Sequence, residues 1–507
     1  MGLFKTRSAA VFGIDAHLID VEVDMYPGSA KDFITVGMPD VAVRESRERI
    51  KSSLINCGFG YPNKSVTINL APANVRKEGA GFDLPMAVGI LGAMGTLAEG
   101  SMERCLLVGE LSLDGGLRPI RGALSIAVRA KQNGIRHLVL PRENGPEAAV
   151  VEGIGVHALR SLAEVVERIG KWDQFPTVTA RSGEEHITPN PLLDFRDVKG
   201  QASTKRALEV AAAGGHNILM IGPPGSGKTM LARRMAGILP ALTFHEAIET
   251  TMIHSVAGLL GPEEGVLRER PFRSPHHITS DAGMVGGGAG IPRPGEVSLA
   301  HNGVLFLDEM PEFSRNTLEV LRQPLEDGTV TVARSMMTLS FPSRFMLVAA
   351  MNPCPCGYYG DTNRECRCTP PQIQRYLGKL SGPLLDRIDI HIEVPAVKYK
   401  DMRSEEATEN SSDIRQRVER AREVQKGRGH YNARLPSRMV RKYCRLDEAG
   451  ERTLEMAVQK MGLSARAYDR VLRLARTIAD LSGAETVSSR HIAEGIQYRS
   501  LDRSYWV

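Results

Sequence analysis

The first 170 residues mix strand-like and helix-like hydrophobic patterns. Short apolar runs of the kind that predict strands occur at 8–14, 17–25, 32–38, 65–73 and 137–141. Apolar positions at helical spacing occur at 41–59, 81–95 and 123–135, and residues 107–120 predict a hairpin that turns at Asp114–Gly116. Together they predict an α/β or α+β domain over residues 1–170.

A strand, a glycine-rich turn and a helix follow one another near the middle of the chain. Apolar residues 218–221 predict a short buried strand, and residues 230–238 have helical spacing. Between them lies a phosphate-loop motif, made of Gly222, Pro223, Pro224, Gly225, Ser226, Gly227, Lys228 and Thr229. Its backbone N–H groups and the helix N-terminus favour an anion. The motif predicts ATP as ligand, with Lys228 on the β/γ-phosphates and Thr229 on Mg²⁺.

Two further buried strands end in polar side chains. Residues 303–307 precede Asp308 and Glu309, which we expect to hold the Mg²⁺ shell and to polarise the attacking water. A solvated turn is the alternative for this acidic pair. Residues 345–351 precede Asn352, and an apolar strand that ends in Asn is by itself a common turn signal.

The domain organisation follows from where hydrophobic periodicity is lost. Residues 171–193 are polar and contain three prolines, which indicates a linker. The strong amphipathic pattern at 463–483 and the shorter pattern at 487–503 predict a helical C-terminal region, with Ser488 or Ser489 as an N-cap. The predicted divisions are residues 1–170, a linker over 171–193, a core that carries the phosphate loop over 194–396 and a helical C-terminal region over 397–507.

Composition and charge limit the partners and the cellular location that we expect for the protein. The chain has 507 residues, a formal net charge of +5 and 5% aromatic residues. This balance permits nucleic-acid binding without a base-stacking platform. No apolar run reaches the length of about 20 residues that spans a bilayer, and the first residues do not form a signal peptide. We therefore expect a cytoplasmic protein without a membrane partner.

Four of the seven cysteines form two close pairs. Cys354 and Cys356 precede Cys366 and Cys368 by a short loop, which indicates a small Zn²⁺ knuckle. The C-x-C spacing is atypical for such a site. Reduced structural thiols and a redox-labile pair remain alternatives.

Parts of the N-terminal region resemble the proteolytic domain of Lon-type proteases. The similar segments are residues 75–85, 109–123 and 134–144. In this register the catalytic Ser falls on Gly81 and the catalytic Lys on Leu124, neither of which can act as nucleophile or base. The resemblance therefore implies a Lon-like fold without peptidase chemistry, and substitution by Ser112 or Ser125 is the alternative.

The central region resembles AAA+ ATPases. Residues 194–201 look like the segment that opens such modules beside the adenine, and residues 270–313 are similar to magnesium-chelatase AAA+ subunits. A predicted hairpin at 327–345, before the sensor strand, marks the clade of chelatases and replicative helicases. The resemblance implies that Arg334, near the hairpin tip, contacts DNA, with a solvated charge as the alternative.

The same resemblance assigns roles to two more arginines and makes Asn352 the sensor residue. Arg387 looks like the arginine finger that a neighbouring subunit supplies, which implies a ring, usually a hexamer; a surface pair with Asp386 or Asp389 is the alternative. Arg466 looks like the second sensor in the lid. Arg470 and Arg473 compete for that role.

As a whole, the chain is identified by these segments as a member of the ComM/YifB family. The resemblance implies an α/β multidomain protein with a Lon-like N-terminal domain, a P-loop AAA+ core with a pre-sensor hairpin and a helical lid. It also implies an ATP-dependent helicase that drives branch migration on branched or single-stranded DNA in recombination or natural transformation. A chelatase-like ATPase that remodels a protein or metal-insertion partner is the alternative, and an ATP-dependent protease is disfavoured because the Ser–Lys pair is missing.

Overall fold

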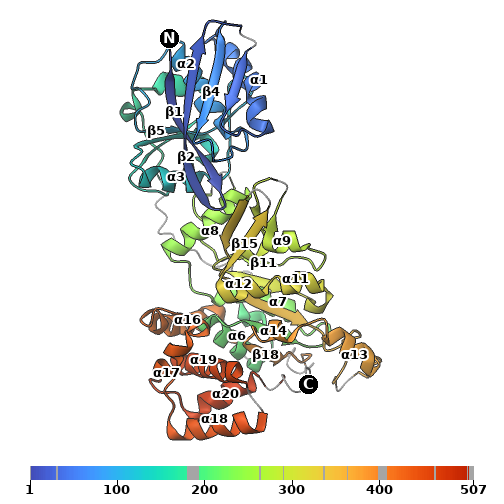
Figure 1. Ribbon diagram of the computed structural model, residues 1–507. Coiled ribbons are helices and arrows are strands. Elements are labelled where there is room, and N and C mark those ends of the chain that lie inside the picture. Colours follow the sequence, from blue (N-terminus) through green and yellow to red (C-terminus); the bar gives the residue numbers. More distant parts are fainter. Residues whose placement is uncertain are drawn as a thin grey trace.

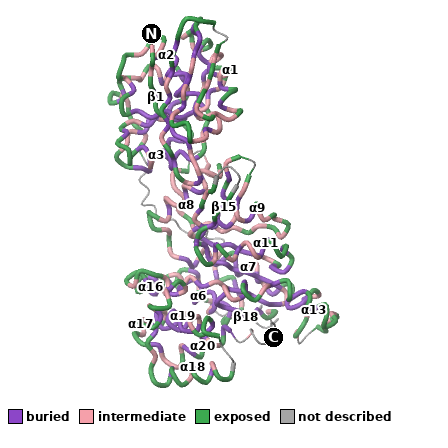
Figure 2. Tube along the Cα trace, viewed as in Figure 1, coloured by how far each residue is buried: buried purple, intermediate pink, exposed green. Residues whose placement is uncertain are grey.

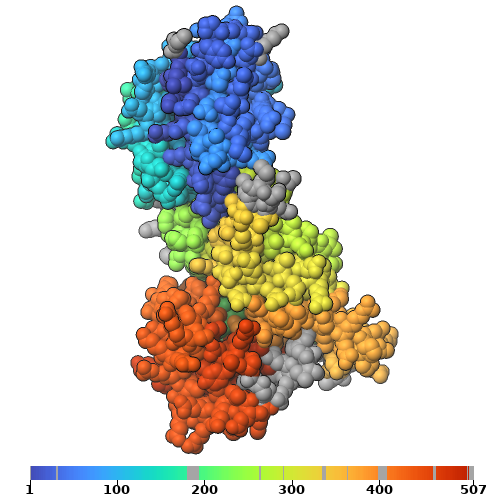
Figure 3. Space-filling view, viewed as in Figure 1, coloured from blue at the N-terminus to red at the C-terminus, as the bar shows by residue number. Residues whose placement is uncertain are grey.

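The structure is a computed structural model that describes residues 2–29, 32–179, 193–261, 264–288, 290–334, 337–361, 364–397, 408–461, 464–499 and 501. Figure 1 shows three parts in succession along an elongated molecule: N-terminal strands, a central sheet and C-terminal helices. The N-terminal part forms a separate lobe in the space-filling view (Figure 3). Buried residues gather along the sheets and the helices that cover them (Figure 2).

The N-terminal part holds two small sheets, and the mixed α/β pattern predicted there is confirmed. One sheet has the order β1-β2-β4-β3 and the other, which is parallel, the order β5-β8-β9. The strands are β1 (Phe4–Phe12), β2 (Asp15–Tyr26), β3 (Phe33–Val36), β4 (Ser65–Ala71), β5 (Cys105–Leu107), β8 (His137–Pro141) and β9 (Gly155–Leu159). The predicted hairpin is β6 (Glu110–Leu111) with β7 (Leu117–Arg118).

Helices cover these sheets because their apolar faces pack on them. The helix α2 is buried at nearly every position, as expected from its uninterrupted apolar sequence. The helices are α1 (Val41–Asn56), α2 (Asp83–Ala93), α3 (Ala123–Gln132), α4 (Gly145–Ala148) and α5 (Leu162–Arg168).

The central part is built on a parallel five-stranded sheet of order β11-β14-β17-β10-β18. The strands are β10 (Ile218–Ile221), β11 (Phe272–Arg273), β14 (Val304–Leu307), β17 (Met346–Met351) and β18 (Ile390–Glu393). Alternate side chains of β10 enter different cores: Ile218 and Met220 one, Leu219 and Ile221 the other. Burial on both faces explains why these strands are continuous apolar runs.

Helices flank both faces of this sheet. They are α6 (Ala202–Gly214), α7 (Lys228–Ile238), α8 (Phe244–Ala257), α9 (Asp281–Val285), α10 (Glu296–Leu299), α11 (Arg315–Glu319), α12 (Arg322–Asp327), α13 (Pro370–Leu377) and α14 (Gly382–Leu385). A short ladder pairs β12 (Gly286–Gly287) with β13 (Arg293–Pro294).

The hairpin predicted within residues 327–345 is confirmed. Strands β15 (Thr329–Arg334) and β16 (Met337–Pro342) pair antiparallel from Thr329–Pro342 to Arg334–Met337. The turn between β1 and β2 approaches this hairpin: a Cβ on Gly13 would lie 3.7 Å from the carbonyl oxygen of Ser340.

The C-terminal part is helical, as predicted. Its helices are α16 (Ser411–Lys426), α17 (Ser437–Tyr443), α18 (Glu448–Met461), α19 (Ala465–Leu481) and α20 (Ser489–Gln497). A capping box at Ser488 opens α20, which confirms the predicted N-cap. In the part of the chain that the structure describes, no helix combines the length and apolarity needed to cross a bilayer.

The N-terminal part docks on the core through α8. Ile248 and Met252 of α8 pack against the apolar cluster that includes α3. At this contact Glu147 is buried; its carboxylate accepts hydrogen bonds from the Ser255 hydroxyl and, at 2.7 Å, from the Leu124 N–H. Burial raises the pKa of Glu147.

Candidate nucleotide-binding site

The phosphate-loop residues form a tight turn between β10 and α7. Gly225 and Gly227 have φ of 76° and 88°, in the left-handed region that glycine adopts without steric cost. A Cβ on Gly222 would lie 2.2 Å from the carbonyl oxygen of Val394, so only glycine fits there. The loop ends at the N-terminus of α7, whose free N–H groups and dipole favour an anion.

Lys228 lies inside the loop with oxygen atoms around its ammonium group. Its Nζ donates to the carbonyls of Gly222 and Pro223 at 2.7 and 2.9 Å, and to Asn352 Oδ1 at 3.2 Å. Burial lowers the pKa of Lys228, although Asp308 and Glu309 act in the opposite direction. The loop therefore holds a desolvated cation where phosphate oxygens would be attracted.

Thr229 and the acidic pair face each other across the cleft. The Thr229 hydroxyl donates to Asp308 Oδ2 at 2.6 Å. The backbone N–H of Glu309 donates to Asp308 Oδ1 at 3.0 Å, and Glu309 has a φ of 49°, which is uncommon for a residue with a side chain. A hydroxyl and a carboxylate at this separation offer the oxygen ligands that Mg²⁺ prefers.

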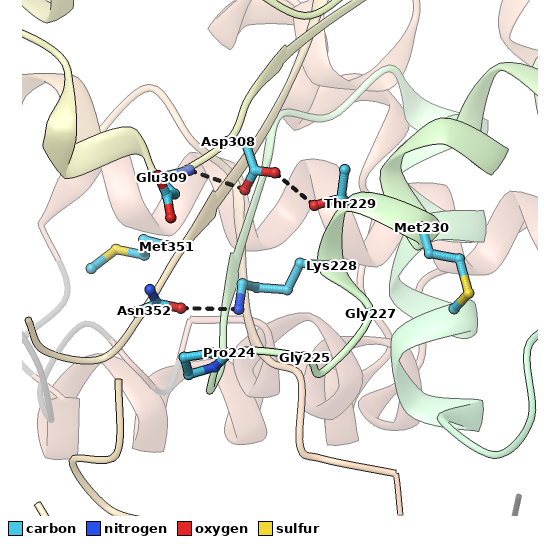
Figure 4. Close-up of a pocket in the computed structure, with 10 residues that line it drawn as sticks. All are labelled: Pro224, Gly225, Gly227, Lys228, Thr229, Met230, Asp308, Glu309, Met351 and Asn352. Atoms are coloured by element: carbon cyan, nitrogen blue, oxygen red, sulfur yellow. Dashed lines mark hydrogen bonds between the residues drawn. The ribbon is translucent and has the colours of Figure 1, made fainter. Parts of the chain in front are cut away.

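These groups line one cleft of about 410 Å³ (Figure 4). Its residues are Pro224, Gly225, Gly227, Lys228, Thr229, Met230, Asp308, Glu309, Met351 and Asn352. Figure 4 shows the Asn352 amide directed at Lys228 while Asp308 faces Thr229. The cleft thus joins a cationic and an acidic side.

Strand register explains why residues so distant in sequence meet. In the sheet, Leu307 pairs with Ala349 and Ile221 pairs with Met351. The residues after these strands, Asp308, Asn352 and Gly222, therefore lie at one carboxyl edge. This edge of a parallel sheet is where α/β proteins bind their ligands.

The segment predicted to lie beside the adenine touches the loop. The Gln201 amide donates to the Ser226 carbonyl at 2.8 Å and to the Pro395 carbonyl at 3.2 Å. Gln201 has a φ of 55°. The motif placed this segment near the nucleotide, but no sequence signal identified the Gln201 side chain as the link.

Arg387 and Arg466, which the AAA+ resemblance assigns to the nucleotide, are not among the described residues that line the cleft. Arg387 donates to Glu326 and, at 2.7 Å, to the Pro383 carbonyl. Arg466 is exposed in the first turn of α19. Arg334 ends β15, and its side chain lies outside what the structure describes.

Arg470 lies at the contact between the C-terminal helix α19 and the central part. Its guanidinium lies 3.7 Å from Asp386 and from Asp389, the two acids weighed as partners of Arg387. Burial lowers the pKa of Arg470. Asp389 also contacts the buried His216, whose other ring nitrogen meets Thr477 of α19. Periodicity alone did not show that these groups join the C-terminal helices to the central part.

The four clustered cysteines converge in space. Their sulfur atoms all lie within 4.8 Å of one another, so the cluster could hold a metal ion. The cysteines are Cys354, Cys356, Cys366 and Cys368. None of them forms a disulfide.

At the positions that correspond to the Lon-type Ser and Lys, the nearest side-chain contacts are apolar. A Cβ on Gly81 would meet Ile120, and Leu124 is fully buried in an apolar cluster. Of the alternatives, Ser112 donates to Asp114 and to the Gly116 carbonyl, and Ser125 is buried and donates to the Ile14 carbonyl. Each hydroxyl therefore donates to an oxygen atom and not to a lysine. A Lon-type mechanism requires a lysine as the base, so neither serine has the expected partner.

Comparisons with known proteins match this chain along nearly its whole length. The family model described as magnesium chelatase, subunit ChlI, matches residues 194–402. Models for subunit ChlI of Mg-chelatase and for the ChlI C-terminal region match residues 21–144 and 408–499.

Several curated proteins are similar to the chain. The competence protein ComM of Haemophilus influenzae is 43% identical over 509 residues, covering 99% of this chain and 98% of the relative. The protein YifB of Salmonella typhimurium is 44% identical with the same coverage. Lon protease 2 of Bacillus subtilis is 32% identical over 149 residues, which are 27% of this chain and 26% of that protein.

The parallel sheet, the phosphate loop and the chelatase matches define the class: a magnesium-chelatase-like protein of the AAA+ type. Within that class, the full-length similarity is decisive. The chain belongs to the ComM/YifB family.

Proposed function

We propose that this protein is an ATP-dependent DNA motor of the helicase or branch-migration type. The main support for ATP hydrolysis is that Lys228, the Thr229–Asp308 pair and Asn352 lie together at one edge of the sheet. Family membership supports the assignment, because magnesium-chelatase-like AAA+ proteins suggest ATP and Mg²⁺ as ligands.

The polar residues of the cleft receive the following roles. The loop N–H groups and Lys228 bind the β/γ-phosphates, and Thr229 and Asp308 hold Mg²⁺, which neutralises phosphate charge. Glu309 orients and polarises the attacking water, and Asn352 positions the γ-phosphate. Because the catalytic groups are fixed on strand ends, little reorganisation is needed during hydrolysis.

Hydrolysis is proposed to need a neighbouring copy of the chain. Arg387 is paired with Glu326 outside the cleft of its own chain, which suits a finger offered to the next subunit. Arg466, or in its place the half-buried Arg470 or Arg473, would then report on nucleotide from the lid. A homo-hexameric ring is the assembly we propose.

DNA is the proposed substrate of the motion. The β15–β16 hairpin stands next to the N-terminal part (Figure 1), and Arg334 at its end would contact a phosphate of branched or single-stranded DNA. The relative called competence protein ComM supports a role in natural transformation or recombination.

The remaining assignments concern the architecture. Residues 1–170 are proposed as a Lon-like domain without the catalytic Ser and Lys, supported by the partial similarity to Lon protease 2. A linker over 171–193, the core over 194–396 and the lid over 397–507 complete the organisation. Zn²⁺ is the proposed metal for the four cysteines, and the cytoplasm the proposed location.

A chelatase-like ATPase that remodels a protein or metal-insertion partner is the second candidate. The three chelatase family models favour it. The test measures the ATP hydrolysis rate with branched DNA, linear DNA, unfolded protein or no addition. Stimulation by branched DNA supports the motor, and stimulation by protein alone supports the second candidate.

A further inference from the structure

Two segments on either side of a short loop bring four thiols to one point directly beyond the nucleotide cleft. Cys354 and Cys356 follow β17, and Cys366 and Cys368 precede α13. Cys354 is fully buried, whereas the other three are half-buried. The cluster therefore ties the end of the sensor strand to the start of the next helix.

The sulfur separations fit one tetrahedral ion. Cys354 Sγ lies 3.3 Å from Cys356 Sγ and 3.7 Å from Cys366 Sγ, and Cys356 Sγ lies 3.6 Å from Cys366 Sγ. Zn–S bonds of about 2.3 Å place tetrahedral sulfurs about 3.8 Å apart. An iron–sulfur cluster distributes its cysteines over several irons, which requires wider spacing. A backbone N–H, that of Cys356, also donates to Cys368 Sγ at 3.4 Å, as expected around a thiolate ligand.

We infer that these four cysteines bind one structural Zn²⁺ and that the ion fixes the loop carrying Asn352 against the phosphate loop. The metal site stands on its own geometry, and its effect on hydrolysis rests on the proposed ATPase function. The ion would position Asn352 through the loop that carries it, without direct contact between the metal and Asn352.

The loop between the thiols and the strand contacts the nucleotide cleft. Asn352, two residues before Cys354, accepts from Lys228 at 3.2 Å. On the other side of the cysteine pair, a Cβ on Gly357 would lie 2.5 Å from Pro224 Cδ, and Gly357 has a φ of 85°. Glycine thus lets the cysteine loop lie directly on the phosphate loop.

Helix α13 also contacts the loop that carries Asn352. Tyr376 is buried in this helix and its hydroxyl interacts with the Asn352 backbone. Cys354 belongs to the same apolar cluster as Tyr376 and Leu377. A metal that joins Cys354 and Cys356 to Cys366 and Cys368 would therefore hold α13 and Asn352 as one unit.

Loss of the metal should affect turnover more than nucleotide binding. Among the residues that the structure describes, no cysteine lines the cleft, and the glycine-rich loop with Lys228 would bind phosphate directly, whereas the position of Asn352 depends on its loop. Without the ion, the link that joins Cys354 and Cys356 to Cys366 and Cys368 is lost, and the loop is held less firmly. Loss of such outer support typically costs about 10–100-fold in activity.

The first measurement is metal content of the full-length protein. We expect one zinc per chain by elemental analysis, lost in the double variant Cys366→Ser/Cys368→Ser and retained in Cys368→His, since imidazole is also a zinc ligand. Cys57→Ser, in the N-terminal part, is the matched control and should keep the zinc. A wild-type protein without stoichiometric zinc, or with iron in its place, overturns the site.

The second measurement compares turnover and nucleotide affinity. In the double variant we expect kcat to fall at least about tenfold with nucleotide Kd unchanged and the far-ultraviolet circular dichroism of the wild type. Cys368→His should recover most of the rate. If the double variant does not fold, wild-type protein stripped of zinc by a chelator and then reloaded serves the same comparison.

The outcomes separate this inference from the proposed function. Zinc loss without a fall in kcat overturns the positioning role. A zinc-loaded wild type that hydrolyses no ATP contradicts the proposed function and the positioning role together, while its zinc content still supports the metal site.

Discussion

The side chains of the nucleotide cleft are satisfied by one another. Lys228 meets carbonyl oxygens and Asn352, and Thr229 meets Asp308. Glu309 occupies a strained left-handed conformation next to this pair, as residues at functional sites often do. The cleft is thus preorganised before its ligands bind.

Replacing Glu309 with Gln should separate binding from hydrolysis. The amide keeps the size of the side chain but cannot polarise water, so we expect ATP to bind normally and kcat to fall about 10²–10⁴-fold. Nucleotide binding by calorimetry and steady-state hydrolysis check this result. Lys228→Ala is the contrasting variant and should bind no nucleotide. Full ATPase activity in Glu309→Gln would show that another residue activates water.

The sequence pointed to the polar residues that the structure brings to the cleft, because the chemistry expected of them requires fixed residue types at strand ends. Gly222 to Thr229, Asp308 and Asn352 could all be found in this way. The partners of Arg387 could not, because Glu326 is brought near only by tertiary packing. Nor could the Gln201 link, since an amide side chain in a loop carries no local pattern.

Among the elements, α8 has a role that its pattern did not show. The amphipathic helices and buried strands were predictable, because periodicity reports which face is buried. The pattern could not show which surface α8 packs against, because its partners, α3 and Glu147, lie more than 100 residues earlier in the chain. The predicted domain boundaries stay a prediction.

Glu147→Gln should stabilise the contact between the N-terminal part and the core at neutral pH. Burial raises the pKa of Glu147, so the folded state holds its proton more tightly than the unfolded state. Its contribution to stability therefore falls as pH rises from its ordinary pKa, about 4.5, through the raised value. Gln accepts the same hydrogen bonds without a charge.

Thermal unfolding checks this expectation. The Tm of Glu147→Gln minus that of the wild type should be larger at pH 8 than at pH 4.5. The exposed Glu143→Gln is the control and should show no such trend. If Glu147→Gln lowers the Tm more at pH 8 than at pH 4.5, the charged form of Glu147 stabilises the fold, which contradicts this prediction.

Arg334→Ala tests the hairpin. If Arg334 contacts a phosphate, its loss should weaken DNA binding uniformly across sequences and reduce the slope of log K against log salt by about 1. Binding titrations over a range of salt concentrations measure both. Arg315→Ala, an exposed arginine on α11, is the control with the same change of charge. An unchanged slope in Arg334→Ala would show that this arginine is a solvated charge and not a DNA contact.

For the whole molecule, the location of Arg387 predicts an active site shared between copies. Arg387→Ala and Glu309→Gln should each be inactive alone, because every interface then lacks one group. Random mixing in a ring gives roughly a quarter of interfaces with both groups intact, and should restore activity in that proportion. Hydrolysis rates of mixed and unmixed samples provide the measurement. No recovery on mixing would place both groups in one chain's site.

The most direct test of the account is branch movement on a synthetic DNA junction, followed by strand displacement with the wild type, Glu309→Gln and no ATP. We predict ATP-dependent displacement by the wild type alone, together with faster ATP hydrolysis when the junction is present. A wild-type protein that hydrolyses ATP but neither moves the junction nor responds to any DNA would contradict the claim that this protein is a DNA motor.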